Sequence, residues 1–313
     1  MKSTVVVPTY NGKKRILNLL RSMQNQSQLP DEIIVVVDGS TDNTIKAIEN
    51  ENFNDLPLVV HVQENKGRPA ARNTGLKLAN HDLIISFDDD MVLTPHVIEL
   101  HVKHHQKHPD SVCIGYQAEK KPEINTPNYH FLDFRYHLSQ KWHKASPHYP
   151  KSMEMHNYQL TTANCSFPKK IIKEVGAFDE NLKEVEDFDL GTRIMKKGFL
   201  MFYNPDILAW HDNPDWDFKK FVQRQVQYRA DDLSFVKKLE VEGSLDERLK
   251  KHPRFRADTK YNFLKSSIIN FLANPTWISM AEKKPFTMLP KTFRYRFMDV
   301  VATAFTYKRK RPE

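Results

Sequence analysis

Three consecutive aspartates, Asp88, Asp89 and Asp90, follow an apolar run that is typical of a buried strand. If the backbone stays extended there, Asp88 and Asp90 point to the same side, and their carboxylates repel each other unless a cation lies between them. Oxygen ligands suit Mg²⁺ or Mn²⁺, and these ions usually share their coordination with substrate phosphates. The triplet therefore indicates a metal that neutralises a phosphate-bearing substrate. The alternative is three turn residues that lead into the next helix.

Polar residues also follow two earlier apolar runs. Asp38 ends the run VVVD, and a carboxylate at that position can accept hydrogen bonds from a ribose or a base. The alternative is a turn before a capped helix. Tyr10 follows the first run, where its ring could stack on a base, and the alternative there is a plain Asn-Gly turn.

Basic residues gather at the start of a helix-like stretch, in the segment NKGRPAARN. Lys66, Arg68 and Arg72 lie at or just inside this predicted helix start. Cations beside the positive end of a helix attract a diphosphate or a partner carboxylate. The alternative is a solvated helix start.

The elements that must position these residues alternate along roughly the first ninety residues. Short apolar runs rich in β-branched residues predict strands, and the stretches between them predict helices, which is the pattern of a mostly parallel central sheet flanked by helices. Ligands of such α/β sheets bind at the carboxyl ends of the strands, where the residues above lie. The predicted strands are Ser3–Val7, Glu32–Val37, Leu58–Val62 and Leu83–Phe87, and the predicted helices are Lys13–Met23, Asn43–Asn50 and Ala70–Ala79.

Beyond the aspartates the pattern is less regular. Residues 117–158 are rich in Pro, His and Tyr and predict loops and short helices, and the chain from Asp217 onward predicts mainly helix. The other predicted helices are Pro95–His108, Lys169–Val175 and Asp187–Lys197, and the other predicted strands are Ser111–Tyr116, Gln159–Phe167, Leu200–Tyr203 and Ile207–Trp210.

Four histidines, His101, His104, His105 and His108, have the spacing that places them on one face of a helix. Such a face could bind a metal. We favour a solvated, partly protonated face, because no carboxylate is paired with the histidines.

Composition narrows the class of protein. The chain has 313 residues, of which 40% are hydrophobic, so it is not mainly disordered, and two cysteines exclude a disulfide scaffold. No apolar stretch reaches the length of a transmembrane helix, and no signal peptide precedes the first strand, so we expect a cytoplasmic protein. The net charge of +8 is uneven: residues 1–250 carry 33 basic and 35 acidic residues, and residues 251–313 carry 14 and 4.

The basic end, residues 251–313, also contains many aromatic residues. Basic and apolar residues on one helix suit an anionic membrane interface, and the alternative is that the apolar face packs on the catalytic domain while the charges are solvated. Nucleic acid is not an expected partner, because no recognition motif is present. A helix over Lys291–Tyr307 would carry Phe293, Phe297, Val300, Val301, Ala304 and Phe305 on one face, with Arg294 beside them and Lys308–Arg311 following.

Seven segments in order resemble the family 2 glycosyltransferases of the GT-A fold. The resemblance implies a Rossmann-like GT-A catalytic domain over residues 1–215, with a nucleotide-sugar half at about 1–115 and an acceptor half at about 116–215. Residues 216–313 would form a mainly helical, basic C-terminal extension. The segments are VVVPTYNG, DEIIVVVDGSTDNT, NKGRPAARNTGL, ISFDDDM, TTANCSFPKK, GAFDENLKEVEDFDL and ILAWHDN.

The resemblance assigns roles to the aspartates. The family transfers a sugar from a nucleotide diphosphate to an acceptor hydroxyl with inversion, and its Asp-x-Asp motif falls on Asp88 and Asp90. This implies Asp90 as a metal ligand and Asp88 as a second ligand, or as a contact to the ribose or a metal-bound water. Asp89, the acidic middle residue, is a further candidate for donor binding.

The remaining matches complete the implied site. Arg68 and Arg72 are implied donor contacts, since Arg72 matches the Arg of the ARN segment. The Glu-Asp motif falls on Glu186 and Asp187, which implies Asp187 as the general base that deprotonates the acceptor hydroxyl. The implied base-binding residues are Pro8, Tyr10 and Asp38, and His211 is an implied metal ligand.

The sequence thus predicts a metal-dependent inverting glycosyltransferase that uses Mn²⁺ or Mg²⁺ and a UDP-sugar. We expect it to act on a carbohydrate or lipid-linked acceptor in polysaccharide or glycolipid biosynthesis, in the cytoplasm or peripherally on the inner face of the cell membrane. One alternative is a GDP- or dTDP-sugar donor. Another is a non-catalytic sugar-binding or scaffold protein, which would not need the set of Asp88, Asp90, Asp187 and His211.

Overall fold

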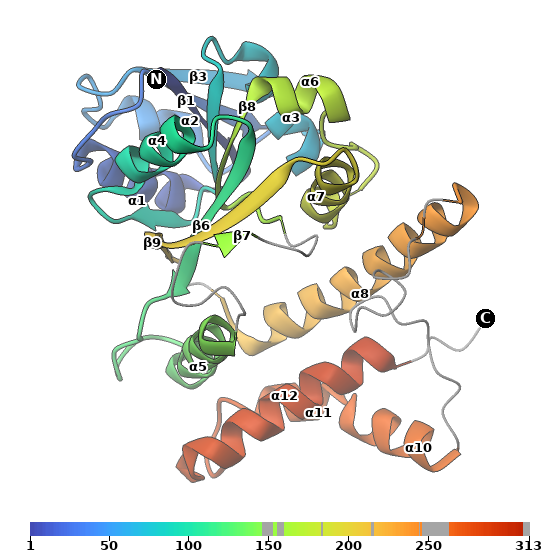
Figure 1. Cartoon of the computed structure of the whole chain (residues 1–313). Helices are drawn as coiled ribbons and strands as arrows, with labels where there is room; N and C mark the ends of the chain where they lie inside the picture. The colour runs from blue at the N-terminus through green and yellow to red at the C-terminus, as the bar shows by residue number, and fades with distance from the viewer. Residues whose placement is uncertain are drawn as a thin grey trace. The chain divides into compact units, whose positions relative to one another are not determined.

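The structure is a computed structural model of the whole chain (Figure 1). It describes residues 1–145, 153–154, 160–182, 184–213, 216–243, 245 and 263–308. The chain divides into two compact units. The first consists of Met1–Lys120 and Ser139–Asn213, and the second of Lys121–Leu138 and Pro214–Glu313.

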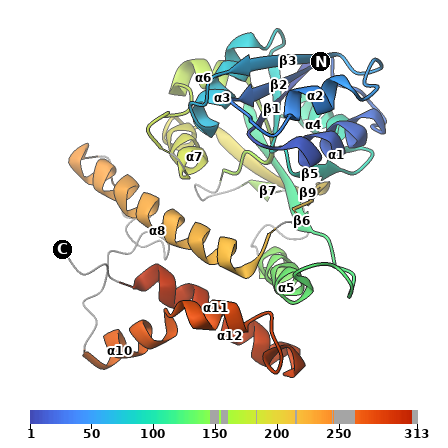
Figure 2. The same ribbon diagram turned by 180° about the vertical axis from the view of Figure 1, so that it is seen from behind.

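The first unit is built on a mixed sheet, with nine strands in the described residues, in the order β3-β2-β1-β4-β8-β6-β9-β5 and with β7 beside β9 (Figures 1 and 2). Neighbouring strands from β3 to β4 are parallel, as are β6 and β9. Strand β8 is antiparallel to both β4 and β6, and β5 is antiparallel to β9. The carboxyl ends of β1, β2, β3 and β4 therefore meet at one edge. The strands are β1 Ser3–Thr9, β2 Glu32–Asp38, β3 Leu58–Gln63, β4 Leu83–Phe87, β5 Met91–Leu93, β6 Ser111–Glu119, β7 Met153–Glu154, β8 Asn164–Pro168 and β9 Leu200–His211.

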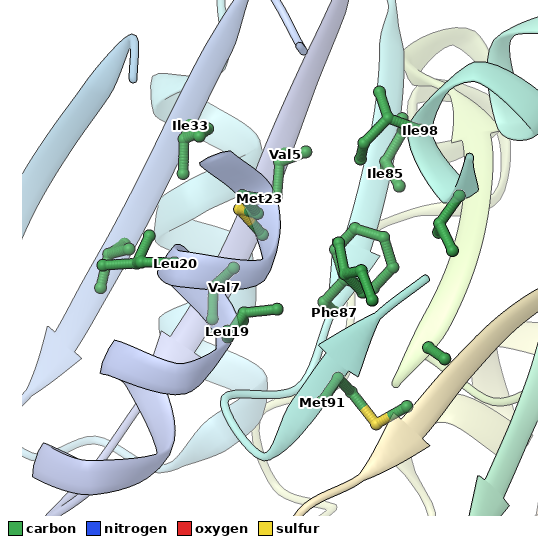
Figure 3. Close-up of a cluster of buried hydrophobic side chains, with 14 of the residues drawn as sticks. Val5, Val7, Leu19, Leu20, Met23, Ile33, Ile85, Phe87, Met91 and Ile98 are labelled. Carbon is green, nitrogen blue, oxygen red and sulfur yellow. The ribbon is translucent and has the colours of Figure 1, made fainter. Parts of the chain in front are cut away.

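Helices cover both faces of this sheet. In β1, Val5 and Val7 join one buried cluster and Val6 joins the other, because successive side chains of a strand point to opposite faces (Figure 3). Burying each such side chain is worth about 1.5–3 kcal/mol, so both faces hold the strands in register. The first cluster includes residues of α1 Lys13–Gln24, α2 Thr44–Glu49 and α4 Val97–Lys107, and the second includes residues of α3 Arg68–Leu78, α6 Lys169–Val175 and α7 Glu186–Lys196.

The predicted α/β architecture is confirmed, and the predicted first four strands and three helices lie within two residues of the observed ones. The prediction of loops and short helices over 117–158 agrees with the loop at 120–128 but was wrong for Tyr129–Ala145, which forms the long helix α5. The two strands predicted at 200–203 and 207–210 are one strand, β9, which continues past a register shift opposite Gly115 and Tyr116 of β6. Gln159 lies outside the described residues.

His101, His104 and His105 are buried and His108 is exposed, so the prediction of a solvated, partly protonated face was wrong for three of the four histidines. His101 and His105 both form hydrogen bonds at 2.8 Å with Ser166, and His104 forms one at 3.0 Å with Ser111. The rings join α4 to strands β6 and β8 through polar contacts. Burial lowers the pKa values of His101 and His104 from 6.5 to about 4 and that of His105 to about 3, so all three are neutral near pH 7.

The second unit is helical in its described part, as predicted from Asp217 onward, and Asp217 caps α8 by accepting a 2.7 Å hydrogen bond from the amide of Lys220. Its core includes Phe131 of α5, Phe218 of α8 and Met298 of α12. None of the described helices combines the length and the apolar character that crossing a bilayer requires. The elements are α8 Phe218–Val241, α10 Phe263–Leu272, α11 Pro275–Met280, the 3₁₀ helix η2 Phe286–Met288 and α12 Lys291–Tyr307.

The predicted apolar face of α12 is divided between core and surface. Val301 and Ala304 are buried, whereas Phe293 and Val300 are exposed. Phe297 and Phe305 also pack against the core of the second unit, so most of this face is covered there and Phe293 and Val300 are not. Of the basic run predicted to follow the helix, only Lys308 lies within the described residues.

The buried histidines predict a loss of stability in mild acid. In the unfolded chain each ring gains a proton near pH 6.5, but in the folded protein it does so only near pH 4 or below. Stability should therefore fall as the pH drops from about 6.5 to about 4, because the unfolded state binds more protons. Thermal unfolding between pH 7.5 and pH 5 measures this effect. His105→Gln should flatten the pH dependence, and an unchanged slope would contradict the assignment.

Candidate active site

The loops after β1 and β2 are fastened to each other at the carboxyl edge of the sheet. Asn11 adopts a left-handed backbone conformation with φ of 47°, which asparagine tolerates better than most residues. Its side-chain oxygen accepts a 2.7 Å hydrogen bond from the amide of Thr41, and its own amide donates at 2.9 Å to Ser40. The predicted Asn-Gly turn therefore exists, and it fixes the backbone on both sides of Tyr10.

Asp38 lies buried at the end of β2 and holds the loop that precedes α3. Its Oδ1 accepts hydrogen bonds from the side chain of Gln63 at 2.8 Å and the amide of Lys66 at 2.9 Å, and its Oδ2 accepts from the amide of Gly67 at 2.8 Å. Gly39 follows with φ of +70°, and a Cβ there would lie 2.7 Å from the amide nitrogen of Asn65. A glycine is therefore required where the two loops meet.

Two of the residues implied to bind the base lie on or beside β1. Pro8 is buried in the part of the strand that pairs only with β2, and Tyr10 is 50% exposed just beyond it. An exposed ring at the end of a strand is available to stack on a planar group. Lys66 is also exposed, so its backbone rather than its ammonium group contributes to the contacts described here.

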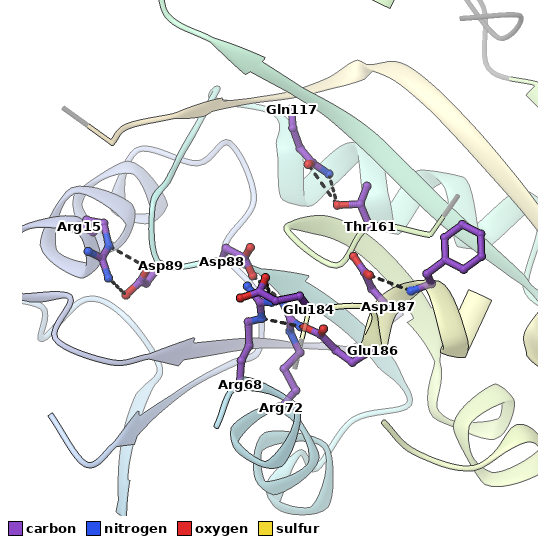
Figure 4. A network of polar contacts seen from close by, with 11 residues as sticks. Arg15, Arg68, Arg72, Asp88, Asp89, Gln117, Thr161, Glu184, Glu186 and Asp187 are labelled. Carbon is purple, nitrogen blue, oxygen red and sulfur yellow. Dashed lines mark hydrogen bonds and ion pairs between the residues drawn. The ribbon is translucent and has the colours of Figure 1, made fainter. Parts of the chain in front are cut away.

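Arg72 is the centre of a buried polar network that joins three elements (Figure 4). Its Nη1 donates to Glu186 Oε1 at 2.6 Å, and its Nη2 donates to Asp88 Oδ1 at 2.6 Å. Arg68 donates to the same Glu186 oxygen at 2.7 Å and to Glu184 at 3.1 Å. Of the two ligands predicted for these arginines, a diphosphate or a carboxylate, the structure shows carboxylates.

The charge on Asp88 is fixed by this network. Burial by itself would raise the pKa of its carboxyl. The positive charges of Arg72 and Arg68 and the hydrogen bond from Arg72 together outweigh burial, so the pKa lies below its usual value of 3.8. Asp88 is therefore an anion at neutral pH, with one oxygen held by Arg72 and its position set by α3.

The aspartate triplet forms a turn, so the extended backbone assumed for Asp88 and Asp90 was wrong. The amide of Met91 donates to the carbonyl of Asp88 at 3.3 Å, which closes the turn. Asp89 points to the other side, where its Oδ2 accepts from Thr9 at 2.6 Å and its carboxylate pairs with Arg15 at 3.1 Å (Figure 4).

Asp89 packs against the start of α1. A Cβ at Gly12 would lie 2.1 Å from Asp89 Oδ2, so only glycine allows this approach. Burial and the nearby charge of Asp90 raise the pKa of Asp89 to about 6, although Arg15 and the hydroxyl of Thr9 act in the opposite direction. Asp89 therefore serves here as the contact that joins the triplet to β1 and α1.

Asp90 and His211 lie on neighbouring chain segments where β5 pairs with β9. His211 is the register partner of Met91, and the amide of Asp212 donates to the carbonyl of Asp90 at 2.7 Å. Asp90 Oδ2 accepts from Asn213 at 3.0 Å. Asp90 Oδ1 and His211 Nδ1 are both shielded from solvent and have no hydrogen-bond partner among the described residues, and His211 Nδ1 lies 3.8 Å from Glu119 Oε1.

Such orphaned atoms fit one half of a metal site. The described residues contain no group of three or more His, Cys, Asp or Glu side chains arranged to hold a metal ion. A carboxylate and an imidazole alone fit an ion that takes its other ligands from a substrate or water, as Mg²⁺ and Mn²⁺ commonly do.

Glu186 and Asp187 begin α7 but differ in their surroundings. Glu186 is buried and bound by two arginines, whereas Asp187 is half-buried and accepts a 2.8 Å hydrogen bond from the amide of Phe188. Gln117 and Thr161, joined by hydrogen bonds of 3.1 and 3.2 Å, are drawn with them in Figure 4. Of the pair, only Asp187 combines a carboxylate with partial exposure.

Several residues of this edge were not found from the sequence. Gln63, Asn213 and Arg15 each hold a predicted site residue. Arg15 lies outside the quoted segments, whereas Asn213 closes the segment ILAWHDN and Gln63 directly follows a predicted strand at the carboxyl edge, so these two had a usable signal.

Arg72 should contribute strongly to stability. Replacing it by methionine leaves Asp88 and Glu186 as buried charges with fewer partners, which costs about 3–5 kcal/mol of unfolding free energy. Arg21→Met, which breaks the exposed pair with Glu51, should cost less than about 1 kcal/mol. Urea denaturation of both variants gives the comparison, and equal losses would show that the buried network is not the stabilising element.

Comparison with known proteins agrees with this geometry. The model of the family described as Glycosyl transferase family 2 matches residues 4–175, which is more than half of the chain. An uncharacterized glycosyltransferase of Bacillus subtilis strain 168, YfnE, is 25% identical over 287 residues, which cover 77% of this chain and 73% of that protein.

Two solved structures share the fold. Residues 1–349 of S. aureus TarS in complex with UDP match with a TM-score of 0.57 at 19% identity, over 98% of this chain and 90% of that one. The mannosyltransferase PcManGT of Pyrobaculum calidifontis, in complex with GDP-Man and Mn²⁺, matches with a TM-score of 0.57 at 17% identity, over 99% and 88%. The chain belongs to glycosyl transferase family 2 and is a glycosyltransferase with the GT-A fold.

Proposed function

We propose that the protein transfers a sugar from a nucleoside diphosphate sugar to an acceptor hydroxyl with inversion, in the presence of a divalent metal. The observation that carries the proposal is the pair of buried atoms without hydrogen-bond partners, Asp90 Oδ1 and His211 Nδ1. A buried polar atom without a partner is costly, and this cost is removed when a ligand occupies the site.

The donor nucleotide is assigned to the edge formed by β1 and β2. Tyr10 offers an exposed ring for the base, Pro8 lies two residues before it in β1, and Asp38 fixes the loop that precedes α3. Asp38 Oδ2 accepts a single hydrogen bond among the described residues, so it retains a lone pair for a ribose hydroxyl or a base. A UDP-sugar is the proposed donor, and TarS, which shares the fold, was solved with UDP.

The diphosphate is assigned to the aspartate turn. Asp90 and His211 would hold the metal, and this mixed oxygen and nitrogen donor set suits Mn²⁺ better than Mg²⁺. When bound, the metal supplies positive charge that stabilises the leaving diphosphate. Asp88 keeps one oxygen for the ribose or a metal-bound water while Arg72 holds the other, and Asp89 positions the turn from behind.

Asp187 is the proposed general base. The attacking hydroxyl must lose its proton to form the new glycosidic bond, and the half-buried carboxylate of Asp187 can accept that proton. Glu186 is a positioning residue in this scheme, because both arginines bind its buried Oε1. Arg68 and Arg72 thus set the place of the base rather than carry the proton.

Asp187→Asn should lower kcat by about 10²–10⁴-fold, since the amide cannot accept the proton, while the Kd for the donor stays unchanged. Asp206→Asn, an exposed carboxylate in the same unit, is the matched control and should transfer sugar normally. Sugar transfer by chromatography and donor binding by calorimetry are the measurements. Transfer by the Asp187 variant at the wild-type rate would exclude Asp187 as the base.

The metal assignment predicts that UDP raises Tm much more with Mn²⁺ than with EDTA. Asp90→Asn should weaken Mn²⁺-dependent binding by tenfold or more, because a neutral amide is a poorer ligand. Asp212→Asn is the control: Asp212 neighbours His211, but its carboxylate accepts from Asn18 and contacts no predicted ligand of the metal. A Tm shift that is the same in EDTA would contradict the metal.

The same thermal-shift measurement separates the alternatives. A larger Tm shift with GDP or dTDP than with UDP would assign a different donor nucleotide. PcManGT, which shares the fold, was solved with GDP-Man. A non-catalytic sugar-binding protein would bind the donor without releasing UDP, and it would be indifferent to Asp187→Asn.

A further inference from the structure

The second unit exposes large apolar side chains where η2 leads into α12. We call residues Lys283–Arg296 the basic corner. Within it, Met288 is 75% exposed, Leu289 is 39% exposed and Phe293 is 57% exposed. Three large apolar side chains within six residues, all facing water, are the sign of a surface that is buried against something else.

The charges of the basic corner all have one sign. Between Lys283 and Met298 the sequence contains five basic residues and no acidic residue. Lys291 pairs with Asp133 at 2.9 Å, and Arg294 is buried. Lys283, Lys284 and Arg296 are exposed and pair with no carboxylate in the described part of the chain.

An aromatic layer gives this region a firm base. Phe297 packs on Phe286 with ring centres 4.6 Å apart and on Trp277 at 5.9 Å, and Trp277 packs on Phe271 at 5.3 Å. The indole nitrogen of Trp277 donates to the carbonyl of Phe271 at 2.8 Å. Because α10, α11, η2 and α12 are joined in this way, the exposed ring of Phe271 is held by the same layer as the corner (Figure 1).

We propose that the basic corner binds the surface of an anionic lipid bilayer. Met288, Leu289 and Phe293 enter the boundary between headgroups and acyl chains, and Lys283, Lys284 and Arg296 contact the lipid phosphates. Binding at such an interface requires apolar side chains that leave water and cations that face the anionic headgroups, and the basic corner has both. Each basic residue near an anionic surface strengthens binding about fivefold, so the three together are substantial.

Other occupants fit the basic corner less well. A second copy of the chain would bring two sets of unpaired cations together, which is unfavourable. Nucleic acid would satisfy the charges, but the corner offers bases a single exposed ring, Phe293, beside the aliphatic side chains of Met288 and Leu289.

Vesicle flotation of the full chain tests the proposal. The wild type should float with vesicles of 30% phosphatidylglycerol in phosphatidylcholine and not with phosphatidylcholine alone, and 0.5 M NaCl should weaken the binding. Met288→Ser combined with Phe293→Ser should lower the bound fraction about tenfold or more, because the apolar contacts are lost. Lys283→Glu combined with Lys284→Glu should also lower the fraction bound to the phosphatidylglycerol vesicles.

The controls keep the outcome clear. Val241→Ser removes another exposed apolar side chain of the same unit, 82% exposed at the end of α8, and should float as the wild type does. Circular dichroism and UDP binding should be unchanged in all variants, since none lies in the proposed donor site. Absence of flotation, equal flotation of the serine variants, or a serine-induced change from dimer to monomer would each overturn the proposal.

Discussion

The buried bridge through Arg72 is the interaction on which the rest of the site depends. A single guanidinium on α3 meets the first carboxylate of the aspartate turn and the first carboxylate of α7. Glu186 is 114 positions from Arg72 in sequence and Asp88 is 16, and the fold brings all three together. Without this guanidinium Asp88 would lose its charged partner and Glu186 would keep Arg68 alone, so the aspartate turn and the start of α7 are held to each other by electrostatics.

Much of this arrangement could be predicted from the sequence. The first four strands read as continuous β-branched runs because both faces of the sheet are covered, and the polar residues at their ends necessarily meet at one edge. The order of the family segments then identified the candidate site residues. Periodicity and order along the chain were sufficient because these features are local or topological.

The failures have a common physical cause, which is that side-chain partners are decided in three dimensions. The histidines of α4 have the spacing of a polar face, yet they are buried because serines on β6 and β8 lie opposite and satisfy them. The long helix α5 was missed because the stretch that contains it is rich in Pro, His and Tyr and shows little apolar periodicity. The aspartate turn was only the alternative interpretation of the triplet, because its closing hydrogen bond uses only backbone atoms, which leave no trace in composition.

The contacts of Asp38 have a consequence for engineering donor preference. A residue expected to contact the nucleotide also anchors the segment 64–67, since it accepts hydrogen bonds from two amides of that segment and from the side chain of Gln63 just before it. Changing it would release a loop as well as alter recognition, so any loss of selectivity would be confounded with disorder. The exposed ring of Tyr10 does not hold a loop in this way, so Tyr10 is the better position at which to redesign donor preference.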